Sequence, residues 1–303
     1  MKSNALWLRA NIIKAIREFF WNRGFLEVET PLLIPANAPE EHINPITPLP
    51  SSWQLQTSPE ICMKRLLCRG HKQLFQISHC WRSEERGTRH LSEFTMLEWY
   101  RADSDYQALM DDCKALLQHI AVICMPDDPV YHHKSCKIDP FLSWRRISVT
   151  EAFLRFGHTN VFDCLQKGLY EEILTSIIEP TLADFSEPVI LMDYPAELAA
   201  LARLKPDQNI LAERFELYLG GLELANGFSE LNDHVEQRRR FEEANRRRIE
   251  NGNTEMILPE PFLRDLAGMP DSAGIALGVD RLVMLAVGAE SIDEVVAFTP
   301  EEL

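Results

Sequence analysis

The sequence predicts an α+β fold, because helical periodicity and paired strands occur in different parts of one chain. Residues 74–100 consist of an apolar run with β character, a charged loop and a second apolar run, which indicates a strand hairpin. Two more short strands are expected on either side of Gly220–Gly221. Helical patterns lie near both ends of the chain, at residues 4–23 and after Gly278. Helices therefore accompany strands that pair locally.

The first helix is predicted over residues 4–23, where apolar side chains recur at helical spacing until Gly24. The next segment, FLEVETPLLIP, alternates like a strand and is interrupted by Pro31. Five prolines in residues 35–52 predict an irregular loop. The apolar stripe of the first helix comprises Leu8, Ile12, Ile16, Phe19 and Phe20.

A second helix is expected in TSPEICMKRLLCRG, with Thr57 or Ser58 as its cap, Pro59 in its first turn and Gly70 at its end. Residues 107–190 contain two or three helical patterns and no motif that indicates a function. The later chain contains a buried strand in VILMDYP, an arginine-rich helix and the closing segment GMPDSAGIALGVDRLVMLAVG. Acidic residues at i,i+4 spacing in the arginine-rich helix favour a solvated face over a nucleic-acid surface.

Composition limits the possible partners. The 303 residues are 46% hydrophobic and 25% charged, as in ordinary globular proteins, and no apolar run approaches the ~20 residues that span a bilayer. Seven cysteines without a C-x-x-C pair predict reduced thiols and a cytoplasmic location. A net charge of −15 disfavours broad nucleic-acid binding, which usually needs a basic face. The acidity favours basic partners or simply keeps the protein in solution.

Several common site signatures are missing from the sequence. It has no G-x-x-x-x-G-K-[ST] loop, no G-x-G-x-x-G after a strand and no H-E-x-x-H pair. His132, His133 and Cys136 lack further ligands at zinc-binding spacing, so we expect them at the surface. The sequence therefore carries none of these nucleotide-binding or metal-binding signatures.

The hairpin loop provides cations next to an aromatic ring. Arg82, Arg89 and His90 lie between the two strands, and Phe94 begins the second strand. Such a hairpin can hold a cation over an anionic ligand and an aromatic face under a flat ring. Near the end of the chain, Gly278 permits close approach of the backbone, and Arg281 lies in the first turn of a helix, where anions are favoured. Either feature alone also fits an ordinary charged surface.

Taken together, these segments resemble the class II aminoacyl-tRNA synthetases. The first helix, strand and Pro31 resemble motif 1, the 74–100 hairpin resembles motif 2, and GIALGVDRLVML resembles motif 3. The resemblance implies a mainly antiparallel sheet flanked by helices, one catalytic domain over residues 1–303 and a homodimer. It also implies ATP as a substrate, with catalytic roles for Arg82 and Arg281. The implied ATP contacts are Arg82, Ser83, Glu84, Arg89, His90, Phe94, Glu223, Leu224, Gly278 and Arg281.

A magnesium site is expected at Glu223 and Glu230 in GLELANGFSEL. The two carboxylates flank Asn226–Gly227, a pair that permits a sharp turn. Mg²⁺ prefers few carboxylates together with phosphate oxygens, so a phosphate site with two glutamates implies this ion. The alternative is a pair of exposed glutamates on either side of a hairpin.

Within the class, TSPE…MKRL, EFTMLEWYRADSDY and ELANGFSELNDHVEQRRRF resemble lysyl-tRNA synthetases. We expect no anticodon-reading OB-fold before the motif 1 helix, and a catalytic core without that module resembles the elongation factor P–lysine ligases. This family implies activation of (R)-β-lysine with ATP and transfer to a lysine of elongation factor P, without tRNA. The implied amino-acid pocket comprises Ser58, Pro59, Glu60, Glu98, Tyr100, Glu230 and Ala276, because a buried ammonium group needs carboxylate partners.

The chain departs from the lysyl-tRNA synthetase pattern at a few positions. Ser83 stands where the family usually has asparagine, and Leu91 cannot donate the hydrogen bond of an asparagine. Ala276 replaces the middle glycine of G-x-G-x-G, and we expect Ala276→Gly to raise activation of α-lysine relative to β-lysine. Two alternatives remain at this point. One is a synthetase that still charges tRNA with lysine, and the other is a synthetase-like binding subunit without catalysis.

Overall fold

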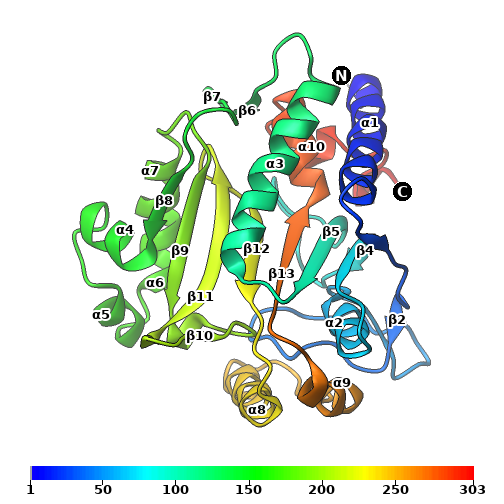
Figure 1. Cartoon of the computed structure of the whole chain (residues 1–303), viewed down its shortest axis with the longest axis vertical. Helices are drawn as coiled ribbons and strands as arrows, with labels where there is room; N and C mark the ends of the chain where they lie inside the picture. The colour runs from blue at the N-terminus through cyan, green and yellow to red at the C-terminus, as the bar shows by residue number, and fades with distance from the viewer. Residues whose placement is uncertain (1) are drawn as a thin grey trace.

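The computed structural model describes residues 2–303, and its centre is a nine-stranded sheet (Figure 1). Only the outermost pairs, β1 with β4 and β8 with β9, are parallel, which confirms the mainly antiparallel sheet. Strand β10 (Leu204–Lys205) pairs with β11 outside the main path. The order is β1 (Leu26–Glu27), β4 (Gln73–Trp81), β5 (Glu93–Ala102), β13 (Ser272–Gly278), β12 (Leu222–Ser229), β11 (Gln208–Leu219), β9 (Val189–Pro195) and β8 (Arg145–Ser148).

Helices cover one face of this sheet: α1 (Lys2–Trp21), α3 (Tyr106–Cys124) and α10 (Val279–Val287) (Figure 1). The predicted stripe of α1 packs into the main core, and four of its members, Ile12, Ile16, Phe19 and Phe20, are fully buried, while Leu8 is partly buried. Each large apolar side chain removed from water contributes roughly 1.5–3 kcal/mol. This packing fixes α1 against the sheet.

Strand alternation determines what the opposite face carries. Leu97 and Trp99 of β5 are buried in the core beneath the helices, as is Leu277 of β13. Because successive side chains point to opposite faces, the residues between them point away from these helices. On β5 and β13 these are Phe94, Met96, Glu98, Tyr100, Gly274, Ala276 and Gly278.

The two predicted hairpins form, but one turn was placed wrongly. Gly220 and Gly221, with φ of +57° and +73°, connect β11 to β12, and both strands are longer than expected. Asn226 and Gly227 do not turn the chain, because they lie inside β12 and pair with β11 and β13. A Cβ on Gly227 would lie 2.8 Å from the ring of Phe215, so packing explains this glycine.

Residues 107–190 hold more helices than the two or three expected. After α3 they form a second core beside β9. His133 is buried, with Nδ1 2.6 Å from the backbone oxygen of Gly220, so its predicted surface position is wrong. The elements are β6 (Tyr131–His133), β7 (Cys136–Ile138), α4 (Val149–Arg155), α5 (Val161–Gln166), α6 (Tyr170–Ile173), the π-helical turn η1 (Leu174–Ile178) and α7 (Glu179–Leu182).

The segment 35–52 is irregular, as expected, and lies between β2 (Leu33–Ile34) and β3 (Gln54–Leu55). Helix α2 (Glu60–Cys68) follows with Pro59 as its N-cap residue rather than in its first turn. Ser58, not Thr57, provides the side-chain oxygen, since its Oγ accepts a hydrogen bond from the Glu60 backbone N–H at 3.0 Å.

The arginine-rich helix is α8 (His234–Glu250), which lies near α9 (Glu260–Asp265). Arg239 and Arg240 pair with Glu236 on its own surface, as the solvated-face interpretation predicted. Arg248 is the exception, because it is only 2% exposed. Short 3₁₀ turns complete the chain: η2 (Ala196–Leu198), η3 (Leu266–Gly268), η4 (Ile292–Glu294) and η5 (Pro300–Glu302).

Candidate active site

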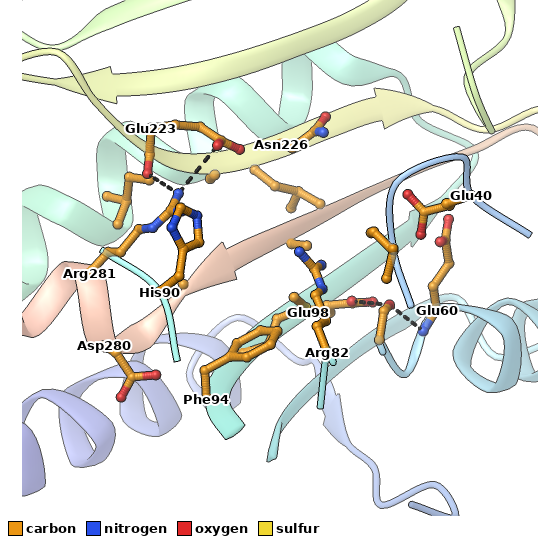
Figure 2. Close-up of a pocket in the computed structure, with 18 of the residues that line it drawn as sticks. Glu40, Glu60, Arg82, His90, Phe94, Glu98, Glu223, Asn226, Asp280 and Arg281 are labelled. Atoms are coloured by element: carbon orange, nitrogen blue, oxygen red, sulfur yellow. Dashed lines mark hydrogen bonds and ion pairs between the residues drawn. The ribbon is translucent and has the colours of Figure 1, made fainter. Parts of the chain in front are cut away.

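A cleft of about 320 Å³ opens on the sheet face that points away from α1, α3 and α10. Figure 2 shows Arg281, His90 and Glu223 at one end and Glu60 and Glu98 at the other. Arg82 and Phe94 lie between them in this view. The two arginines of the predicted motifs 2 and 3 therefore line one cleft.

Most predicted site residues line this cleft, and four do not. Glu84 is exposed, in the left-handed region at φ +66°, and Ser83 uses its backbone N–H to donate to the Asn44 oxygen at 2.7 Å. Pro59 begins α2, and Glu230 lies buried behind the cleft wall. The lining members are Ser58, Glu60, Arg82, Arg89, His90, Phe94, Glu98, Tyr100, Glu223, Leu224, Ala276, Gly278 and Arg281.

At one end of the cleft, Arg281 is fixed by the first turn of α10 and by β12. Its Nη1 donates to the backbone oxygen of Glu223 at 2.7 Å and lies 3.3 Å from the carboxylate. Its Nη2 lies 2.7 Å from His90 Nε2, and burial together with the Arg281 charge lowers the pKa of His90. A neutral imidazole can accept this hydrogen bond. This end is built to meet negative charge.

Arg82 has few fixed partners. Its guanidinium carbon lies 5.1 Å from the Phe94 ring centroid, and Nη1 is 3.6 Å from Glu85. The buried Nε has no hydrogen-bond partner among the described residues. An unpaired buried donor is costly, so a ligand with anionic oxygens at this point would be stabilised.

The other end of the cleft is rich in carboxyl groups. Ser58 Oγ donates to Glu98 Oε1 at 2.5 Å, and the Tyr100 hydroxyl donates to Oε2 at 2.7 Å. Burial and the charge of Glu60 raise the pKa of Glu98 to about 7. Glu230 Oε1 has no hydrogen-bond partner among the described residues. Such a site favours a cation with several N–H donors, which describes an ammonium group.

Lys64 is a site residue that was not predicted from the sequence. Its Nζ lies 2.5 Å from both Glu60 and Glu230, and it is almost completely buried. The i,i+4 spacing of Glu60 and Lys64 on a helix was a signal that they could pair. Lys64 therefore neutralises part of the charge behind the pocket.

The prediction that Glu223 and Glu230 share a magnesium ion is wrong. The two residues lie at opposite ends of β12, and seven residues at about 3.3 Å each separate them by roughly 23 Å. Glu216 of β11 is the better partner for Glu223, because Tyr218 pairs with Glu223 and Glu216 lies on the same face. Burial and then the Glu223 charge raise the pKa of Glu216.

Glu216 and Glu223 together fit a divalent cation. Arg214 Nη2 and the Tyr218 hydroxyl, each 2.7 Å away, hold the Glu216 carboxylate in place. No cluster of three metal-binding side chains occurs among residues 2–303, but Mg²⁺ needs only one or two carboxylates when phosphate oxygens supply the rest. The alternation of Arg214, Glu216 and Tyr218 along β11 was the signal that the sequence offered.

Helix α7 brings the region 107–190 to the same end of the cleft. Arg89 Nη1 lies 3.8 Å from Glu179 Oε2. Burial raises the pKa of Glu179 to about 7, although the charge of Arg89 lowers it. This ion pair brings α7 beside Arg89, which lines the cleft.

Comparison with known proteins agrees with this geometry. The family model "tRNA synthetases class II (D, K and N)" matches residues 1–302. The chain belongs to this family. Among curated proteins, elongation factor P–(R)-β-lysine ligases from Salmonella gallinarum (strain 287/91), Salmonella paratyphi B and Salmonella heidelberg are each 41% identical over 306 residues. Each alignment covers 96% of this chain and 93% of the relative.

Proposed function

We propose that this protein activates (R)-β-lysine with ATP as an adenylate and transfers the acyl group to a lysine side chain of elongation factor P. The observation that carries this proposal is the single cleft that joins Arg82 and Arg281 to a pocket of carboxyl groups. An AMP-forming ligase for a dicationic amino acid needs both ends at once. The names of the relatives at 41% identity support the amino acid and the acceptor.

In the first step, an oxygen of the substrate carboxylate attacks the α-phosphorus of ATP, and pyrophosphate leaves. Arg82 meets the charge that develops on the α-phosphoryl oxygens, and its fork also holds the carboxylate. Arg281, Arg89 and His90 contact the leaving phosphates, and Phe94 stacks on the adenine. Mg²⁺ held by Glu216 and Glu223 would neutralise phosphate charge.

In the second step, a deprotonated lysine amine of the acceptor attacks the adenylate carbonyl. An amide bond forms, the bond between carbonyl carbon and phosphate oxygen breaks, and AMP leaves. The amino acid stays in place because its ammonium groups pair with carboxylates near Ser58, Glu60 and Glu98. The methyl group of Ala276, opposite Glu98 in the sheet, narrows this pocket.

We also propose that the protein is a homodimer in the cytoplasm. The seven cysteines are all free thiols, which fits a reducing compartment. Large apolar side chains on and after α1 are exposed, including Trp7 at 72% and Trp21 at 52%. Exposed apolar area of this kind favours an interface.

Light scattering tests the dimer. The measured mass should be twice the chain mass, and Trp7→Glu should shift it toward the monomer; a monomeric wild type would contradict the dimer. No helix among residues 2–303 is long and apolar enough to cross a bilayer.

Intact-mass analysis tests the proposed function. Elongation factor P is incubated with the protein, ATP and one lysine isomer at a time. We expect a mass gain of one lysyl unit with (R)-β-lysine and none with Arg82→Ala. Lysine attachment to total tRNA would instead indicate a tRNA-charging enzyme. Absence of ATP–pyrophosphate exchange with every lysine isomer would indicate a binding subunit.

A further inference from the structure

The proline-rich segment 35–52 contributes a carboxylate to the cleft that sequence reasoning did not find. Glu40 lines the cleft together with Glu60, and Figure 2 shows the two carboxyl groups near each other at the amino-acid end. The charge of Glu60 acts on Glu40, which supports their proximity. Glu40 is thus part of the pocket wall although it lies in an irregular loop.

The loop around Glu40 is held by hydrogen bonds from the buried Arg248. Its Nη1 donates to the backbone oxygens of Glu40 at 2.7 Å and Ile43 at 2.8 Å, and Nη2 donates to Asn44 Oδ1 at 2.8 Å. The Asn44 backbone oxygen in turn accepts from the Ser83 N–H at 2.7 Å. These bonds connect the loop that carries Glu40 to the residue that follows Arg82.

The carboxylate of Glu40 lacks a cationic partner. Among the described residues, no lysine or arginine nitrogen forms an ion pair with it. Burial raises the pKa of Glu40 to about 7, the charge of Arg82 lowers it and that of Glu60 raises it. A cation placed between Glu40 and Glu60 would relieve the repulsion and give Glu40 a partner, while Glu60 keeps its contact with Lys64.

We propose that Glu40, together with Glu60, binds the substrate ammonium group that lies nearer the reacting carboxylate. The terminal ammonium group then lies at Glu98, beside Ser58 and Tyr100. The assignment follows from the position of Glu40 and Arg82 in one cleft and from the hydrogen bonds that join the Glu40 loop to Ser83, because Arg82 holds the carboxylate and the near ammonium group is only one or two carbons away. This inference rests on the proposed function and adds to it a residue that distinguishes backbone-amino isomers.

The test compares three ligands that differ only in their ammonium groups. (R)-β-Lysine has both groups, 3-aminohexanoate keeps only the near one and 6-aminohexanoate keeps only the terminal one. Dissociation constants are measured by calorimetry without ATP for wild type, Glu40→Gln, Glu40→Asp and Glu41→Gln. Glu41 is a matched control, because it lies on the same loop, pairs with Arg247 and Asn251 and does not line the cleft.

We expect Glu40→Gln to raise the dissociation constants of (R)-β-lysine and 3-aminohexanoate about tenfold or more. The dissociation constant of 6-aminohexanoate should stay within about twofold of the wild-type value. Glu40→Asp should retain most of the affinity, and Glu41→Gln should bind like wild type. Equal weakening of all three ligands, or none, would overturn the assignment, as would normal binding with loss of only the transfer step. If binding depends on Glu40 but wild type adds no mass to elongation factor P, the proposed function fails and the ammonium site stands.

Discussion

Lys64 and Glu230 form an ion pair of 2.5 Å in which both side chains are almost completely withdrawn from water, at 2% and 0% exposure. Lys64 comes from α2, while Glu230 follows β12, so the pair joins two distant parts of the chain behind the amino-acid pocket. Glu60 lies 2.5 Å from the same ammonium group and faces the cleft. One buried cation therefore pairs with a carboxyl group of the pocket wall and with another behind it.

Lys64→Met should be strongly destabilising. It leaves Glu60 and Glu230 without their cation, and breaking a buried pair costs about 3–5 kcal/mol. Urea denaturation measures the free energy of unfolding. The control is Lys14→Met, since Lys14 is exposed and its surface pair with Glu18 contributes about 1 kcal/mol or less. A loss near 1 kcal/mol for Lys64→Met would show that the pair is not buried in solution.

Stability should fall as the pH rises from about 5 to 8. Burial raises the pKa of Glu98 from 4.5 to about 7, so the folded protein retains a proton that the unfolded chain releases. The stabilisation is complete below pH 4.5 and is lost as the pH passes 7, by up to about 1.4 kcal/mol per pH unit. Glu98→Gln should make the decline shallower in urea denaturation at several pH values. An identical slope in wild type and variant would contradict this.

A methyl group on Gly274 should close the amino-acid pocket. A Cβ there would lie 2.2 Å from Tyr100 Cε1 and 2.4 Å from Glu230 Oε1, both of which are buried. Gly274→Ala should raise the KM for (R)-β-lysine at least tenfold and leave ATP binding nearly unchanged. Gly268→Ala is the control, because nothing lies within 4 Å of its added Cβ. Unaltered KM in Gly274→Ala would mean that the substrate does not use this wall.

The sequence predicted the elements better than the pairing of their side chains. Helical and alternating patterns identified α1, β5 and β9 because those periods follow directly from backbone geometry. The turn at Asn226–Gly227 was predicted wrongly, because an Asn-Gly pair inside a strand cannot be told from an Asn-Gly turn by sequence. Here the glycine packs against Phe215. Glu40 could not be found, since nothing local to a proline-rich loop shows that Arg248 fixes it over the cleft. Those contacts exist only in the folded chain.

Loss of Arg281 should slow the activation step that uses ATP. Arg281→Ala removes the guanidinium that lies 2.7 Å from His90 and from the Glu223 backbone oxygen. We expect kcat for ATP–pyrophosphate exchange to fall about a hundredfold, as for other groups that stabilise developing charge. Arg86→Ala is the control, because Arg86 pairs with Glu301 and Asp293 outside the cleft. Equal losses in both variants would contradict a specific role of Arg281 in the cleft.

A crystal structure with ATP and (R)-β-lysine bound tests the central claim most directly. The account predicts one bent triphosphate, with the α-phosphate hydrogen-bonded to Arg82 and the terminal phosphates to Arg281, and both ammonium groups at the carboxyl-rich end. A nucleotide that contacts only one of these arginines, or an amino acid bound outside the shared cleft, would contradict it.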